Sequence, residues 1–107
     1  MNAQPAQPTT LTDGEIVARV CAGEQQLFEL LMRRHNARLY RAARAIVHDE
    51  GEAEDVMQDA YVRAYEHLRE FAGRAQFSTW LTKIAVYEAL ARVRKGKRFD
   101  SLEAHAE

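Results

Sequence analysis

An apolar residue recurs every four positions between residues 81 and 93, and this period limits the fold of the chain more than any other feature. A row of that spacing lies along one side of an α-helix and lets that side pack on a core. The row consists of Leu81, Ala85, Ala89 and Val93, and it is widened by Trp80 and Ile84. Ser78 or Thr79 is expected to cap the start of this helix, and Gly96 is expected to end it.

Earlier segments show the same helical period. Thr12 and Glu15 have the spacing of a capping box, which opens a short helix that stops near Gly23. Residues 24–47 form a second amphipathic pattern of about six turns with an arginine-rich side. Its apolar stripe consists of Leu27, Leu31, Leu39, Ala43 and Ile46.

A third segment begins at Asp49, where Glu52 repeats the capping-box spacing. Its apolar stripe consists of Ala53, Val56, Met57, Ala60, Ala64, Leu68 and Phe71. Residues 72–76 contain Gly73 and are expected to form a short loop. Because no run of alternating apolar residues is long enough for a strand, the sequence predicts an all-α, compact bundle of about four helices.

The length of 107 residues suits one small domain with a single modest core. We expect residues 1–11 to be a flexible lead, residues 12–95 the helical domain, and residues 96–107 a basic-to-acidic tail or linker. Cys21 is the only cysteine, so an internal disulfide is excluded, and its apolar context predicts a small buried side chain in a reducing compartment. No apolar run approaches the roughly 20 residues of a membrane span, and the secretory-signal pattern is missing, so we expect a cytoplasmic protein without membrane insertion.

Charge is divided unevenly along the chain, although the net charge is only −1. Residues 49–70 hold eight acidic side chains against two arginines, whereas residues 74–98 hold seven basic side chains against Glu88 alone. Such a division favours two different partners, one basic and one polyanionic. Ordinary solvated helix faces are the alternative explanation of both charge runs.

Polar positions of the last helix are expected to face away from its apolar stripe. These positions are Lys83, Tyr87, Glu88 and Arg94. An exposed aromatic ring among cations suits nucleic acid, because phosphates bind the cations and an unstacked base can stack on the ring. An ordinary terminal helix with a solvated basic end remains the alternative.

The motifs typical of enzymes and of metal sites are missing from the sequence. None of the four histidines has a glutamate three residues before it, and the HExxH, GxxxxGK[ST], GxSxG and GxGxxG patterns do not occur. The acidic residues of the third segment lie on a predicted helix and not on a glycine-turned calcium loop. We therefore expect no catalytic residue, cofactor or metal, and we interpret His35 as a partly buried packing residue.

Three segments together resemble the second conserved region of bacterial sigma factors of the extracytoplasmic-function group, within the sigma-70 superfamily. They are LFELLMRRHNARLYRAARAIV, AEDVMQDAYVRAYEHLREF and FSTWLTKIAVYEALARVRKGKR, in the order and spacing of that family. The resemblance runs from about Thr12 to Arg98. It implies a sigma region-two helical domain that binds core RNA polymerase and recognises and melts the −10 promoter element to start transcription.

The resemblance also assigns residues to each partner. In the family, the helix matching EDVMQDA docks on the clamp helices of the beta-prime subunit, and its polar positions here are Asp55, Gln58 and Asp59. The flipped base of the single-stranded −10 element would enter a pocket formed by Arg74, Ala75, Gln76, Phe77, Ser78 and Thr79, with Trp80 nearby. The following helix would contact DNA through Lys83, Tyr87, Arg92 and Arg94, and the basic end would add Lys95, Lys97 and Arg98. An anti-sigma factor is a further partner that the resemblance allows.

Two departures from the family pattern leave alternatives open. Tyr87 stands where most relatives have asparagine, so the ring can stack on a base but has no paired donor and acceptor for a base edge. Full-length relatives continue into a second helix-turn-helix domain, whereas this chain ends at Glu107, as an excised domain or a naturally short protein would. The alternatives are a polymerase-binding regulator without promoter reading and a generic helical interaction module.

Overall fold

The computed structural model describes residues 10–71, 73 and 75–106, and for residues 99–101 and 104–106 it describes the backbone alone. This part of the chain contains four α-helices, two 3₁₀ turns and no strand. The helices are α1 (Asp13–Cys21), α2 (Phe28–Arg44), α3 (Glu50–Glu66) and α4 (Phe77–Ala106), and the 3₁₀ turns are Gln25–Leu27 and Leu68–Glu70. The predicted all-α bundle is therefore confirmed.

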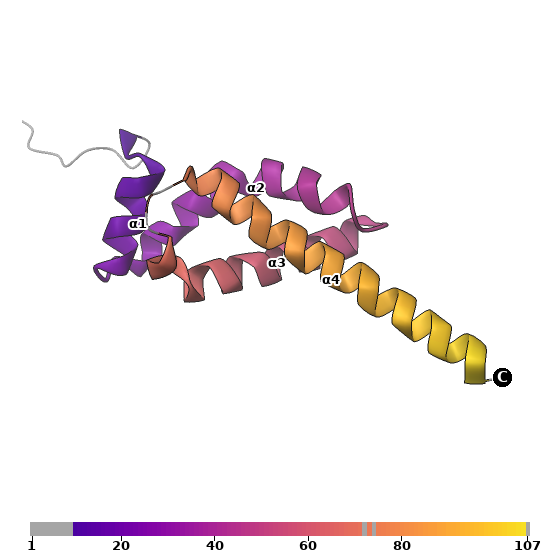
Figure 1. The fold of residues 1–107 in the computed structure, drawn as a ribbon. Coiled ribbons are helices and arrows are strands. Elements are labelled where there is room, and N and C mark those ends of the chain that lie inside the picture. Colours follow the sequence, from indigo (N-terminus) through magenta and orange to yellow (C-terminus); the bar gives the residue numbers. More distant parts are fainter. Residues whose placement is uncertain (1–9, 72, 74, 107) are drawn as a thin grey trace, which may run out of the picture.

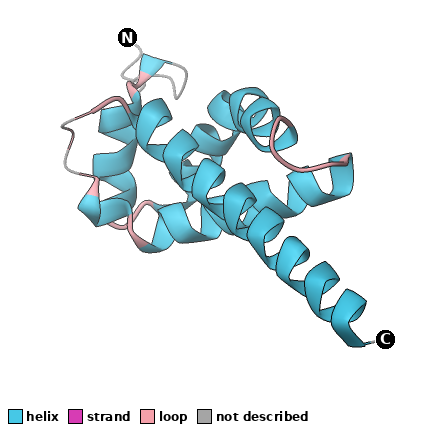
Figure 2. Ribbon diagram, turned by 45° about the vertical axis from the view of Figure 1, so that its right-hand side comes forward, coloured by secondary structure: helices cyan, strands magenta, loops and turns pink. Residues whose placement is uncertain are grey.

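Helices α2, α3 and α4 pack on one another, and α1 covers one end of the bundle (Figure 1). The C-terminal part of α4 extends beyond the other helices in both ribbon views (Figure 1 and Figure 2). No helix in the described part of the chain is long and apolar enough to cross a membrane.

Alanines allow the three long helices to approach closely. Ala43 of α2, Ala60 of α3 and Ala85 of α4 are fully buried, as is Ala89 one turn further along α4. The larger fully buried side chains are Ile16, Leu31, Leu39, Val56 and Leu81. Helix axes come nearer to each other when the side chains at the contact are small, so the polar side chains that flank this core can reach from α4 to α3.

The predicted helix starts are confirmed at α1 and α3. At α1, the Thr12 hydroxyl accepts a hydrogen bond from the Glu15 amide (3.1 Å), and the Glu15 carboxylate accepts one from the Thr12 amide (2.8 Å). At α3, the Asp49 carboxylate accepts from the Glu52 amide (2.8 Å). The described contacts of Glu52 include no return bond to Asp49, so the second capping box is only half formed.

Helix α2 is shorter than the six turns that the sequence suggested. Residues 25–27 form a 3₁₀ turn shortly after Gly23, which follows the end of α1 with a positive φ of 118°. At the other end, the Arg44 guanidinium donates to the Val47 carbonyl (3.1 Å), within an irregular turn that leads to α3. The helical pattern of apolar residues thus continues through segments that are not α-helical.

The residues predicted to cap the start of the last helix and to end it were both wrong. Helix α4 begins at Phe77, with the Gln76 carbonyl accepting from the amides of Thr79 and Trp80 (both 3.1 Å), so Ser78 and Thr79 lie inside the first turn. Gly96 does not end the helix, which continues to Ala106. A single glycine costs a helix only about 1 kcal/mol relative to alanine, and Lys95 and Lys97 on either side are good helix formers.

His35 connects the first turn of α4 to α1. Its side chain is buried, as expected of a packing residue, and its ring lies 5.5 Å from that of Phe77. The His35 Nε2 atom lies 2.9 Å from an Asp13 carboxylate oxygen, and the second oxygen of Asp13 pairs with Arg34 (3.1 Å). By contrast, Cys21 is only partly buried at the edge of the core.

The expected boundaries of the domain remain predictions. Of the expected flexible lead, residues 1–9 lie outside the described residues, and Leu11 packs against the core. Residues 96–106 of the expected tail belong to α4.

Candidate nucleic-acid interface

The outer face of α4 presents an aromatic ring between two cations. It consists of Lys83, Tyr87, Leu90 and Arg94, which recur at intervals of three and four residues and so share one side of the helix. All four are exposed, and Tyr87 is the most exposed large hydrophobic side chain described, at 69%. Lys97 and Arg98 continue the exposed cations beyond this face. The arrangement expected for Lys83, Tyr87 and Arg94 is present.

The residues expected to form the base pocket have different exposures. Ala75, Gln76 and Thr79 are exposed, and Ser78 and Trp80 are partly buried, so these positions are accessible at the start of α4. Arg74 lies outside the described residues.

Phe77 is buried and therefore supports the loop before α4 without offering its ring to solvent. Its ring centroid lies 5.4 Å from that of Phe71, nearly perpendicular to it, and 5.7 Å from that of Trp80. Gly73 has a φ of 72°, a left-handed conformation that glycine adopts without strain. The aromatic cluster and the glycine turn together fix where the chain enters α4.

The basic end of α4 is divided between two sides of the helix. Arg94, Lys97 and Arg98 are exposed, but Arg92 extends toward α3, where its Nη2 atom donates to an Asp59 carboxylate oxygen at 2.8 Å. Its Nη1 atom lies 3.8 Å from a carboxylate oxygen of Asp55. The hydrogen bond to Asp59 raises the pKa of Arg92, and the nearby negative charges of Asp59, Asp55 and Glu52 act in the same direction. Arg92 thus lies at the helix interface.

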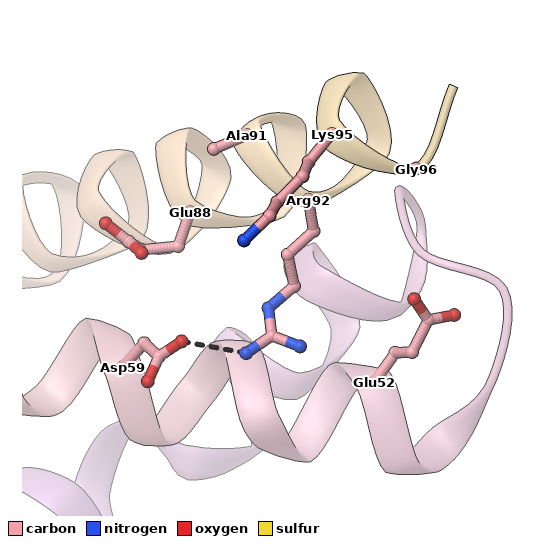
Figure 3. Close-up of a pocket in the computed structure, with 7 residues that line it drawn as sticks. All are labelled: Glu52, Asp59, Glu88, Ala91, Arg92, Lys95 and Gly96. Atoms are coloured by element: carbon pink, nitrogen blue, oxygen red, sulfur yellow. Dashed lines mark hydrogen bonds and ion pairs between the residues drawn. The ribbon is translucent and has the colours of Figure 1, made fainter. Parts of the chain in front are cut away.

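Arg92 and Lys95 also line an open groove between α3 and α4 of about 560 Å³. The groove is lined by Glu52, Asp59, Glu88, Ala91, Arg92, Lys95 and Gly96. Figure 3 shows the side chain of Arg92 reaching from α4 to α3, whereas that of Lys95 lies along α4. Among the cations expected to bind DNA, Arg92 is paired with α3, whereas Lys95 lines the groove and is exposed.

Glu88 does not face away from the core as the sequence suggested. Its side chain is only 18% exposed, and it forms an ion pair with the Arg63 Nε atom of α3 at 2.7 Å. Glu88 follows Leu81 by seven residues and Arg92 follows it by eleven, which are close to two and three helical turns. This spacing placed both residues on the packed side, and it was the signal that the sequence analysis missed.

The acidic face of α3 lies next to this interface. It consists of Asp55, Gln58, Asp59 and Val62, all exposed and spaced by three or four residues. Val62 is an exposed large hydrophobic residue that sequence reasoning did not select, although it follows Gln58 by four positions and Asp59 by three. The three residues expected to contact polymerase are therefore together on one surface, with an apolar side chain beside them.

The described residues contain no group of three or more histidine, cysteine, aspartate or glutamate side chains that could hold a metal ion.

Comparison with known proteins identifies one family along most of the bundle. A family model described as Sigma-70 region 2 matches residues 31–99. The RNA polymerase sigma-H factor of Pseudomonas aeruginosa is 35% identical over 96 residues, covering 89% of this chain and 50% of the relative. The ECF RNA polymerase sigma-E factor of Escherichia coli is 39% identical over 79 residues, covering 74% of this chain and 41% of the relative. The chain spans about half the length, or less, of these curated relatives.

A solved structure shares both the fold and the sequence pattern. It is the NMR structure of an engineered region 2 of sigmaE in complex with GTAAAA. The TM-score is 0.70 with 33% sequence identity, and the match covers 92% of this chain and 97% of the other. The fold of most of this chain thus has a counterpart in a region 2 that was solved in complex with GTAAAA.

Proposed function

The chain belongs to the Sigma-70 region 2 family, and on this basis we propose that it binds core RNA polymerase and recognises and melts the −10 promoter element. The observation that carries the proposal is the outer face of α4, where Tyr87 is exposed between Lys83 and Arg94. The similar region 2 of sigmaE is in complex with GTAAAA, which supports a single-stranded, adenine-rich ligand.

Strand capture provides the free energy for melting. Extruding a base from the duplex costs a few kcal/mol, and the protein can offset that cost by stacking the base and neutralising its phosphates. Stacking on an aromatic ring contributes about 1–3 kcal/mol per base. Tyr87 supplies a ring, the exposed cations of α4 supply the charge, and the accessible positions from Ala75 to Thr79 are proposed to receive the flipped base. The chemistry of RNA synthesis is then left to the polymerase.

The acidic face of α3 is proposed to contact the clamp helices of the beta-prime subunit. Asp55, Gln58 and Asp59 are exposed together and offer negative potential to a basic partner, and Val62 adds apolar area. Action on core polymerase implies the cytoplasm, and an anti-sigma factor that covers either face would block the function.

The test is binding of the domain to a fluorescent single-stranded GTAAAA oligonucleotide, with core polymerase present, against an oligonucleotide of scrambled sequence. We expect tighter binding to GTAAAA than to the scrambled strand. Binding to core polymerase without any binding to either oligonucleotide would instead support a regulator that lacks promoter reading. Failure to bind core polymerase would contradict the proposed function.

A further inference from the structure

An arginine of α4 is already paired with the acidic face of α3. The Arg92 guanidinium bonds Asp59 at 2.8 Å and lies 3.8 Å from Asp55, so one side chain of α4 contacts two of the three polar residues proposed to meet polymerase. The Arg92 side chain is 33% exposed, whereas Asp59 and Asp55 are 51% and 64% exposed. The carboxylates are therefore accessible from solvent while the arginine approaches them from the bundle.

This arrangement weakens the attraction of the acidic face for a basic partner. A guanidinium beside two carboxylates cancels part of their negative potential and occupies acceptor sites that another arginine or lysine would use. A basic surface that docks there must share the carboxylates with Arg92 or displace it.

The groove between α3 and α4 provides a place for a displaced Arg92. Arg92 lines this groove of about 560 Å³, and so does Glu52, one turn before Asp55. Figure 3 shows Glu52 on the side of Arg92 opposite to Asp59. The charge of Glu52 already acts favourably on the guanidinium. Moving from Asp59 toward Glu52 would therefore keep Arg92 beside a carboxylate.

We propose that Arg92 is an internal competitor of RNA polymerase, bound to Asp55 and Asp59 in the free domain and displaced from them when the basic surface of polymerase docks on α3. The proposal rests on the proposed function, because it assigns the acidic face to polymerase. Under this proposal, the affinity of the domain for polymerase depends on a residue of α4.

The test compares the affinity of core polymerase for the wild-type domain and for Arg92→Gln. Removing the competitor should tighten binding about two- to fivefold, because partly exposed ion pairs contribute modestly. Arg38→Gln is the matched control, since Arg38 is an exposed arginine of α2 that forms no ion pair within the described residues. This control should bind like wild type. Arg92→Lys keeps the charge but loses the two-pronged contact, so it should show a smaller gain than Arg92→Gln.

The outcomes separate this inference from the proposed function. If wild type does not bind core polymerase, the proposed function fails. If wild type binds, and neither Arg92 variant binds more tightly than Arg38→Gln, the internal competitor is disproved while the proposed function stands. Thermal unfolding of each variant checks that the bundle is intact, and Arg92→Lys supplies the comparison if Arg92→Gln does not fold.

Discussion

Arg92 and Arg94 are two residues apart on α4, yet their side chains lie in opposite environments. Arg92 bonds Asp59 across the interface with α3, whereas Arg94 is exposed on the outer face with Tyr87. Two residues turn a helix by about 200°, so neighbours of this spacing point in nearly opposite directions. The charge that a nucleic acid would meet on α4 is therefore set by helical phase and not by the number of cations in the segment.

The same division lets α4 pack against α3 on one side and present exposed side chains on the other. Toward α3, the side chains of α4 change from apolar at Leu81 and Ala85 to charged at Glu88 and Arg92, and these charged groups pair with α3. The four residues of the outer face are exposed. Each prediction below alters one side of this comparison, in order of decreasing effect.

The largest effect is expected from reversing the charge of the acidic face. Asp55→Arg combined with Asp59→Arg should abolish binding to core polymerase, because like charges at an interface of complementary potential cost several kcal/mol. The double variant also loses both contacts of Arg92, so its melting temperature should fall slightly while the helical circular dichroism is retained. If the double variant pulled down core polymerase as strongly as wild type does, α3 would not be part of the polymerase interface.

A pair of leucine truncations compares the packed and outer sides of α4 by stability. Leu81→Ala should lower the free energy of unfolding by about 2–5 kcal/mol, because Leu81 is fully buried and its loss leaves a cavity. Leu90→Ala is the matched control on the outer face, where the loss should be about 1 kcal/mol or less. Urea unfolding measures both, and equal losses would show that the two sides of the helix are packed alike.

Substitutions of Tyr87 test whether the outer face of α4 stacks on a base of the promoter strand. Tyr87→Ala should weaken binding to all −10 variants alike, by about 1–3 kcal/mol, since a stacked ring tolerates any base. Tyr87→Asn should instead increase the discrimination between bases by about 1–3 kcal/mol, the range of a good base-edge contact. Oligonucleotides that differ at single positions measure both effects in the presence of core polymerase. Unchanged affinity and preference in both variants would mean that Tyr87 is a surface aromatic that does not contact DNA.

Much of the fold could be predicted because burial follows the helical period. The stripes through Leu31 and Leu39, Val56 and Ala60, and Leu81 and Ala85 are buried as expected. The ends of the elements were harder to predict, because glycine has opposite roles at Gly23 and Gly96. Gly23 adopts a positive φ after α1, whereas Gly96 continues a helix in which the neighbouring residues favour helical structure.

The candidate site could be predicted only in part, because composition does not specify which helix a charge will face. The exposed positions of Tyr87, Arg94 and Asp55 agree with expectation. The contacts of Arg92 with Asp59 and of Glu88 with Arg63 join residues 33 and 25 positions apart, and each depends on how α3 and α4 pack. A helical projection would have placed Glu88 and Arg92 on the packed side, but their partners come from the tertiary structure.

The salt dependence of oligonucleotide binding tests the division of α4 most directly. Each phosphate neutralised on a single strand contributes about −0.7 to the slope of log affinity against log salt. We predict that Arg94→Gln weakens binding of the single-stranded −10 oligonucleotide and makes the slope shallower by about 0.7, while Arg92→Gln leaves the wild-type slope. If Arg92→Gln reduced the slope as much as Arg94→Gln, Arg92 would contact the strand and the two sides of α4 would not be separate.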